Sequence, residues 1–102
     1  MKEDILTKIE NDFAPDDAEI VRESLLDAIR QKPKLYNDRV LRCILFVSEG
    51  DLNKFEEAHK SAETDYRDLI VSAEYACGKH EMDDWKRSRN FEHPFGEECK
   101  DF

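Results

Sequence analysis

The feature that most constrains the fold is the placement of the helix-breaking residues. Only three prolines and three glycines occur among the 102 residues. Pro15, Pro33 and Gly50 separate stretches in which apolar residues recur every three or four positions. This spacing places apolar side chains on one face of an α-helix. The sequence therefore predicts a succession of amphipathic helices joined by short connections.

Three helices are predicted in the first half of the chain. Residues 3–13 carry apolar side chains four positions apart, and Pro15 suits the first turn of a second helix that ends before Pro33. Asn37 is a suitable N-cap for a third helix over residues 38–49. This third helix is apolar on more than one side, which is typical of a helix at the centre of a fold. We therefore expect it to be the hub of the core.

Two further helices are predicted in the second half. Gly50 ends the third helix and Asp51 can cap the fourth, so these two helices should pack as an antiparallel pair. Thr64 or Asp65 can cap a fifth helix, which Gly78 ends. The predicted fold class is all-α: a single domain of about five short helices, arranged as an orthogonal bundle or as a short stack of helix hairpins.

The helical pattern stops in the last quarter of the chain. We expect a helical domain over residues 1–80 and an irregular C-terminal tail over residues 81–102, where charges alternate with isolated aromatic residues. The tail can fold back onto the helices or fray. Alternatively, it can be a short linear segment in which Trp85, Phe91 and Phe95 anchor in the groove of a partner protein.

The chain is strongly acidic. Its formal net charge is −9, and 40% of its residues are charged. An acidic surface repels a phosphate backbone, so direct binding of nucleic acid is not expected. A basic protein partner is easier to accommodate, because opposite charges steer association.

The cysteines and the short apolar runs favour a cytoplasmic location. Cys43, Cys77 and Cys99 are an odd number, and the N-terminus lacks an apolar segment resembling a secretion signal. The longest apolar run, residues 43–47, is far shorter than the roughly 20 residues that a transmembrane helix needs. We therefore expect a cytoplasmic protein without a membrane partner.

A zinc site is the sharpest metal hypothesis that the sequence offers. Its ligands would be Cys77, His80, His93 and Cys99, which are of the right types and number for a tetrahedral structural site. The competing interpretation is that Cys77 is a small apolar residue at an inward-facing helix end, while His80 and His93 are exposed.

The sequence gives no sign of catalysis. It contains no recognisable nucleophile elbow, and its glycines, at positions 50, 78 and 96, are too dispersed for a phosphate-binding loop. Glu56 and His59 match only half of a carboxylate-bridged di-metal pattern. We therefore predict that the protein is not an enzyme and uses no cofactor.

The densest polar cluster at a predicted helix start consists of Asp65, Tyr66, Arg67 and Asp68. Negative charge suits a helix N-terminus, so capping and pairing with a neighbouring helix can explain these side chains. Alternatively, the four residues form a small recognition patch with Tyr75 that binds a partner protein.

The stretch from Arg39 to Tyr75 resembles a group of small, uncharacterised bacterial helical proteins. In that group, a segment like residues 50–52 precedes one helix, and a segment like residues 65–68 opens the next. The resemblance covers about a third of the chain. It implies an all-helical fold and a bacterial source, and it implies no particular activity.

Three functions from different classes are compatible with these features. The first is a protein-interaction or adaptor domain. The second is a small regulatory metal-binding protein that uses the four zinc-type ligands. The third is an inhibitor or antitoxin-like protein that meets a basic partner through the acids of the second and fourth helices. Those acids are Asp16, Asp17, Glu19, Glu23, Asp27, Glu56, Glu57 and Glu63.

Overall fold

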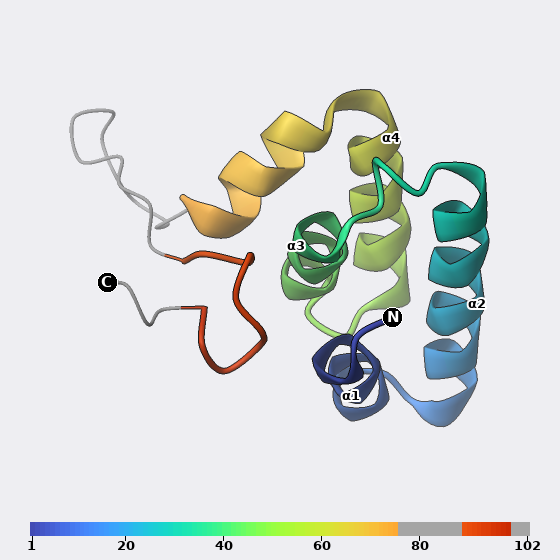
Figure 1. Cartoon of the computed structure of the whole chain (residues 1–102). Coiled ribbons are helices and arrows are strands. Elements are labelled where there is room, and N and C mark those ends of the chain that lie inside the picture. Colours follow the sequence, from blue (N-terminus) through green and yellow to red (C-terminus); the bar gives the residue numbers. More distant parts are fainter. Residues whose placement is uncertain (76–88, 99–102) are drawn as a thin grey trace.

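The chain folds as a succession of α-helices, which Figure 1 shows in order from the N-terminus. The computed structural model describes residues 1–75 and 89–98. The helices are α1 (Glu3–Asp12), α2 (Pro15–Gln31), α3 (Asp38–Ser48) and α4 (Leu52–Glu74). No β-strand occurs in these two ranges. The prediction of an all-α fold is therefore confirmed.

Helices α2, α3 and α4 begin where the sequence supplies residues suited to a helix start. Pro15 occupies the first position of α2, where its missing N–H costs no hydrogen bond. The side-chain oxygen of Asn37 accepts a hydrogen bond of 3.0 Å from the backbone N–H of Val40. The carboxylate of Asp51 accepts one of 2.8 Å from the N–H of Asn53. Both predicted N-caps are therefore in place, at the starts of α3 and α4.

The turn between α3 and α4 requires glycine. Glu49 and Gly50 have φ values of 50° and 74°, in the left-handed region that ends many helices. A Cβ atom on Gly50 would lie 2.3 Å from the carbonyl oxygen of Asp12, at the end of α1. Glycine thus allows both the turn and the close approach of α1.

Helix α4 changes direction at Asp65. The backbone of Asp65 is non-helical, with φ −157° and ψ 92°, and its carboxylate accepts hydrogen bonds from the N–H groups of Arg67 (3.1 Å) and Asp68 (3.4 Å). Figure 1 shows the second half of α4 turning away from the first. The predicted fifth helix thus begins at its predicted cap, but it continues α4 through a kink rather than after a loop. Its predicted end, Gly78, lies outside the described residues.

Helix α3 is the centre of the core, as its pattern predicts. Its side chains from Val40 to Leu45 are buried, α4 and α1 pack against it, and α2 packs against α1 and α4. Such burial is the main stabilising term for a domain of this size, at about 1.5–3 kcal/mol for each large apolar side chain. The core also takes residues from the other helices, including Ile5, Ile9, Val21, Leu25, Phe55, Ala62, Leu69 and Ala73.

Residues 89–98 form an irregular segment that packs against the helices. The N–H groups of Arg89, Phe91 and Phe95 donate to helix residues Glu74 and Asp4, and other backbone hydrogen bonds are made within the segment. Phe91 has no exposed surface and belongs to the core. The expected boundary at residue 80 lies outside the described residues, but part of the expected tail, residues 89–98, is integral to the fold.

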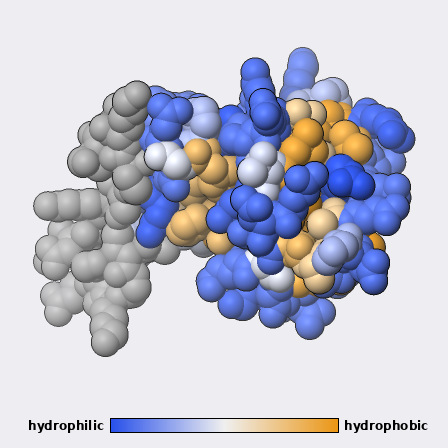
Figure 2. Space-filling view, turned by 90° about the horizontal axis from the view of Figure 1, so that it is seen from below, coloured by the Kyte–Doolittle hydropathy of each residue, from blue (hydrophilic) through white to orange (hydrophobic). Residues whose placement is uncertain are grey.

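The surface is mostly hydrophilic. In Figure 2, polar and charged side chains cover most of the visible face, and hydrophobic surface gathers in patches between them. Within residues 1–75 and 89–98, no helix has both the length and the apolar character needed to cross a lipid bilayer.

Candidate functional site

Four charged side chains hold the C-terminal segment against the helices, and we call them the clamp: Asp4, Arg39, Arg42 and Glu74. The guanidinium of Arg42 donates to both carboxylate oxygens of Asp4, at 2.9 and 3.2 Å. It also donates to the carbonyl oxygen of Phe91 at 3.1 Å. Because the Arg42 side chain is only 5% exposed, this ion pair is shielded from water and from salt.

Glu74 forms the other half of the clamp. It has no exposed surface, and its two oxygens accept hydrogen bonds of 3.0 and 2.7 Å from Arg39. One of these oxygens also accepts the backbone N–H of Phe91 at 3.0 Å. Hydrogen bonding to Glu74 raises the pKa of Arg39. The N–H and the carbonyl of Phe91 are thus both bound by buried charged groups, which fixes the segment in register.

The carboxylate of Asp4 links the clamp to the end of the segment. It accepts the backbone N–H of Phe95 at 3.1 Å, in addition to its bonds from Arg42. Burial acts to raise the pKa of Asp4, but the hydrogen bonds from Arg42 and from Phe95 outweigh it and lower the pKa below its ordinary value. Asp4 is therefore held in its charged form.

Residues 89–98 lie on a surface formed by α1, α3 and α4, which we call the seat. Aromatic and cationic side chains complete it. The ring of Phe91 lies 5.1 Å from that of Phe46 and 5.7 Å from that of Phe95. The guanidinium of Arg89 lies 4.5 Å from the centre of the Phe46 ring, and the ammonium of Lys8 lies 5.3 Å from that of Phe95. These are favourable cation–π distances. The chain thus binds its own aromatic segment, which carries Arg89 and three glutamates, on α1, α3 and α4.

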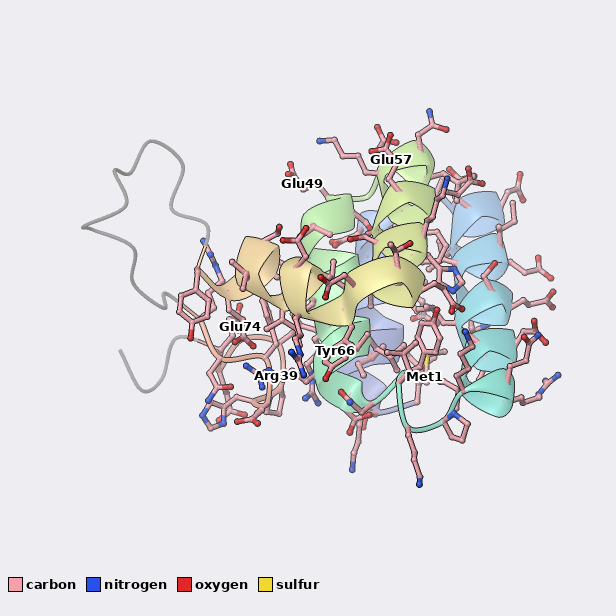
Figure 3. The ribbon with its side chains drawn as sticks, turned by 90° about the horizontal axis from the view of Figure 1, so that it is seen from above. Met1, Arg39, Glu49, Glu57, Tyr66 and Glu74 are labelled. Atoms are coloured by element: carbon pink, nitrogen blue, oxygen red, sulfur yellow. The ribbon has the colours of Figure 1, made fainter. Side chains whose placement is uncertain are left out.

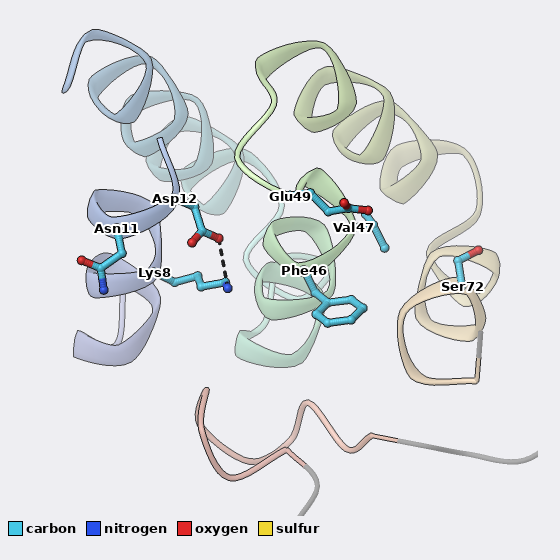
Figure 4. A pocket seen from close by; sticks show the side chains of 7 residues that line it. All are labelled: Lys8, Asn11, Asp12, Phe46, Val47, Glu49 and Ser72. Atoms are coloured by element: carbon cyan, nitrogen blue, oxygen red, sulfur yellow. Dashed lines mark ion pairs between the residues drawn. The ribbon is translucent and has the colours of Figure 1, made fainter. Parts of the chain in front are cut away.

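An open groove lies beside this seat, between α1, the end of α3 and the second half of α4 (Figure 4). In Figure 4, Lys8 and Asp12 stand on one side, Phe46 lies in the middle, and Ser72 lies on the other side. This hollow has a volume of about 670 Å³. A second hollow of about 360 Å³ adjoins it and shares Val47, Glu49 and Ser72. We call the two together the α3 groove.

The groove exists because of two local features of the chain. The kink at Asp65 carries the second half of α4 away from its first half, so Ser72 faces α3 across a gap. Phe46 and Val47 lie at the end of α3 and are only partly covered by the rest of the core. Leu69 adds a buried apolar wall from α4. The result is an apolar floor that no described segment fills.

The rim of the groove is charged, with an excess of acid. Lys8 and Asp12 form an ion pair of 3.0 Å, and Lys54 lies 3.8 Å from Glu49. Glu57 is exposed and makes no ion pair with any residue in the described ranges. Figure 3 shows Glu49 and Glu57 projecting from the same end of the molecule. The rim thus carries three carboxylates and two ammonium groups, and Glu57 is the carboxylate left without an ion pair among the described residues.

The polar cluster predicted from the sequence is a surface feature of the kink. Asp65, Tyr66, Arg67 and Asp68 are all exposed, and Arg67 stacks 5.9 Å from the centre of the Tyr66 ring. Tyr75 lies at the other end of this half of α4, about 14 Å away at the helical rise per residue. The structure therefore brings the first four residues together and leaves Tyr75 apart from them.

The aromatic residues considered as partner anchors have different positions. Phe91 is buried in the core, and Phe95 is half-buried between α1 and Phe91. Both rings are therefore engaged within the chain, because the clamp holds their backbone against the helices. Trp85 lies outside the described residues.

The zinc hypothesis falls mainly on residues that are not described. Cys77, His80 and Cys99 all lie outside the described ranges, while His93 is half-buried in the C-terminal segment. Within residues 1–75 and 89–98, no three His, Cys, Asp or Glu side chains gather in a way that could hold a metal ion. The four-ligand site therefore stays a prediction.

A small polar cluster joins the connection before α3 to the first half of α4. The hydroxyl of Tyr36 donates to Glu63 at 2.7 Å, and Lys32 pairs with the same carboxylate. The ring of His59 packs edge-on against Tyr36 at 5.4 Å, and burial lowers its pKa, partly offset by the charge of Glu63. Burial, with a further contribution from Glu63, strongly raises the pKa of Tyr36. This cluster ties two elements together.

Reasoning from the sequence missed both the clamp and the groove. Arg42 gave one usable signal, because it is the only charged residue between Val40 and Val47. A charge inside such an apolar run is buried when it has a partner, but the partner lies 38 residues away. The surplus of apolar residues at the end of α3 was the corresponding signal for the groove.

Comparisons with known protein families, with curated proteins and with solved structures found no significant match to this chain. The resemblance over Arg39 to Tyr75 therefore stays a prediction from the residues themselves.

Proposed function

We propose that this chain is a small helical protein-interaction domain, rather than an enzyme, and that the α3 groove is where it binds a segment of a partner protein. One observation carries the proposal: Phe46 and Val47 form an apolar floor in an open hollow of about 670 Å³ that no described part of the chain occupies. Concave apolar surfaces bordered by polar groups are where proteins bind ligands and peptide segments.

The seat of residues 89–98 supports this proposal by example. There, the same helices bind an irregular segment through an aromatic side chain, backbone hydrogen bonds and cation–π contacts. The groove continues that surface along α3, since Phe46 contacts Phe91 and also lines the hollow. A partner segment in the groove would therefore extend a mode of recognition that the fold already uses.

The overall charge favours a protein partner. With a net charge of −9, the chain would repel the phosphates of a nucleic acid, whereas a basic protein would be attracted to it. The burial of Cys43 at the centre of α3 suits a thiol that stays reduced. We place the domain in the cytoplasm as part of the same proposal.

Site-specific photocrosslinking in cells that express the full chain tests the proposal. A benzophenone amino acid replaces Ser72, which is exposed at the groove, or Asp27, which is exposed on α2. We expect a discrete crosslinked protein from position 72 and not from position 27, and we expect Val47→Asp to abolish it. Crosslinks that are absent at position 72, or that survive Val47→Asp, would contradict the proposal.

A further inference from the structure

We infer that the occupant of the α3 groove is a basic amphipathic segment of the partner, with Lys or Arg side chains flanking apolar ones. This inference rests on the proposed function, because it names the partner class for the same groove. Three features of the described residues lead to it: the rim charges, the cation–π contact that Phe46 already makes with Arg89, and the total charge of the chain.

The rim carries negative charge that the chain itself does not neutralise. Lys8 is held by Asp12, and Lys54 lies near Glu49, so neither ammonium is available to an acidic ligand without first losing its own partner. Glu57 has no ion pair with a described residue. A cation from a partner therefore gains an attraction here, while a carboxylate meets repulsion.

The floor of the groove also favours a cation. Phe46 already carries a guanidinium, from Arg89, 4.5 Å from its ring centre on the side of the C-terminal segment. Lys8 makes the converse contact, with the cation on α1 and the Phe95 ring on the C-terminal segment, where the groove meets a third hollow lined by α1 and by Phe95. A segment that alternates apolar and basic side chains would match this surface, since it can place the former on the floor and the latter against the rim.

The total charge disfavours the other occupants. A second copy of the chain would also carry −9, so the two copies would repel each other at long range. An acidic segment would meet both the general repulsion and the uncompensated Glu57. A basic segment is instead steered to the domain, and its binding should weaken as salt is added.

Two synthetic peptides of equal length, with identical leucine and phenylalanine positions, serve as probes. One has lysine and the other glutamate at every polar position, and both carry a fluorescent label for anisotropy titration against the full chain. The variants are Glu57→Lys, on the groove rim, and Glu23→Lys, on the exposed face of α2, which change the net charge equally. Val47→Asp tests whether a peptide sits on the groove floor.

We expect the lysine peptide to bind at low salt and the glutamate peptide not to bind. Glu57→Lys should lower the affinity for the lysine peptide by about fivefold or more, and Glu23→Lys should lower it by less than about twofold, because only the first charge lies at the site. Equal weakening by both variants would overturn the inference, since it would indicate attraction by net charge alone.

Other outcomes separate this inference from the proposed function. If the glutamate peptide binds and Val47→Asp abolishes its binding, the groove binds partners but the basic class is overturned. If neither peptide binds, the basic class is also overturned, and the crosslinking from position 72 decides the proposed function independently. Binding of the lysine peptide that Val47→Asp leaves intact would overturn the inference as well.

Discussion

The seat of residues 89–98 and the α3 groove lie side by side on the same helices, yet residues 89–98 fill the first and no described residue fills the second. In the seat, the buried side chains of Glu74 and Arg42 bind the backbone N–H and carbonyl of Phe91. In the groove, the charged groups are at the rim and Phe46 and Val47 remain partly uncovered. The chain uses the first surface for its own stability, and on our proposal the second binds a partner.

The largest expected effect is the difference in stability loss between truncating a side chain in the seat and truncating one in the groove. Phe91→Ala should lower the free energy of unfolding by about 3–5 kcal/mol, because it empties a fully buried site and loosens the ring of Phe46. Val47→Ala, on the groove floor, should cost about 1 kcal/mol or less. Urea unfolding followed by circular dichroism measures both. Equal losses would show that the two surfaces contribute alike.

Breaking the clamp should have a slightly smaller effect. Arg42→Met keeps the volume but leaves the carboxylate of Asp4 largely buried without its ion pair, which should cost about 3 kcal/mol. Arg22→Met, at a half-buried position of α2 with no ion pair in the described ranges, should stay within about 0.5 kcal/mol. The same urea titrations apply. A loss at Arg42 as small as that at Arg22 would mean that the clamp does not hold the segment.

The turn that shapes the end of the groove should be the next most sensitive. Gly50→Ala meets both a left-handed backbone and the carbonyl oxygen of Asp12, so we expect a loss of about 2 kcal/mol or more. Gly96→Ala has a φ of 95° but open space around the added Cβ, so its loss should be about 1 kcal/mol. Thermal and urea unfolding measure the stability of both variants. Equal losses would show that the close approach of α1 to Gly50 does not contribute to the loss.

The smallest expected effect is the pH dependence of the clamp. The pKa of Asp4 is lowered in the folded chain, so its contribution is fully present above the ordinary pKa near 3.8 and is lost as the pH falls through the lower, folded value. Asp4→Asn should therefore be less stable than the native chain at neutral pH and should lose stability less steeply below about pH 4. The free energy of unfolding of both proteins, measured from neutral pH to below about pH 4, tests this prediction. Curves of stability against pH that run parallel for the two proteins would contradict it.

Local features of the fold were predictable because their causes are local. Asn37 and Asp51 cap helices through bonds to residues two or three positions away, and Gly50 ends a helix through its own backbone. The cap at Asp65 was predictable for the same reason. Whether the chain kinks or breaks there was not, because the direction of the second half of α4 depends on its packing against α3.

The candidate site was less predictable because it joins distant residues. Arg39 and Glu74 are 35 residues apart, and the N–H of Phe91 reaches Glu74 across 17 residues. In the sequence, Arg39 and Glu74 look like ordinary charged helix residues and Phe91 like an isolated aromatic residue, so nothing marks them as one cluster. The groove depends on the kink at Asp65, and its acidic rim combines residues of α1, α4 and the α3–α4 turn.

The most direct test of the central claim is a chemical-shift titration of the full, isotopically labelled chain with the lysine peptide. We predict that the largest amide shifts occur at Val47, Glu49 and Ser72, while the amides of Glu74 and Phe91 keep their positions and the clamp stays closed. Shifts centred on Glu74 and Phe91 would contradict the account, because they would show that the partner replaces the chain's own segment instead of binding beside it.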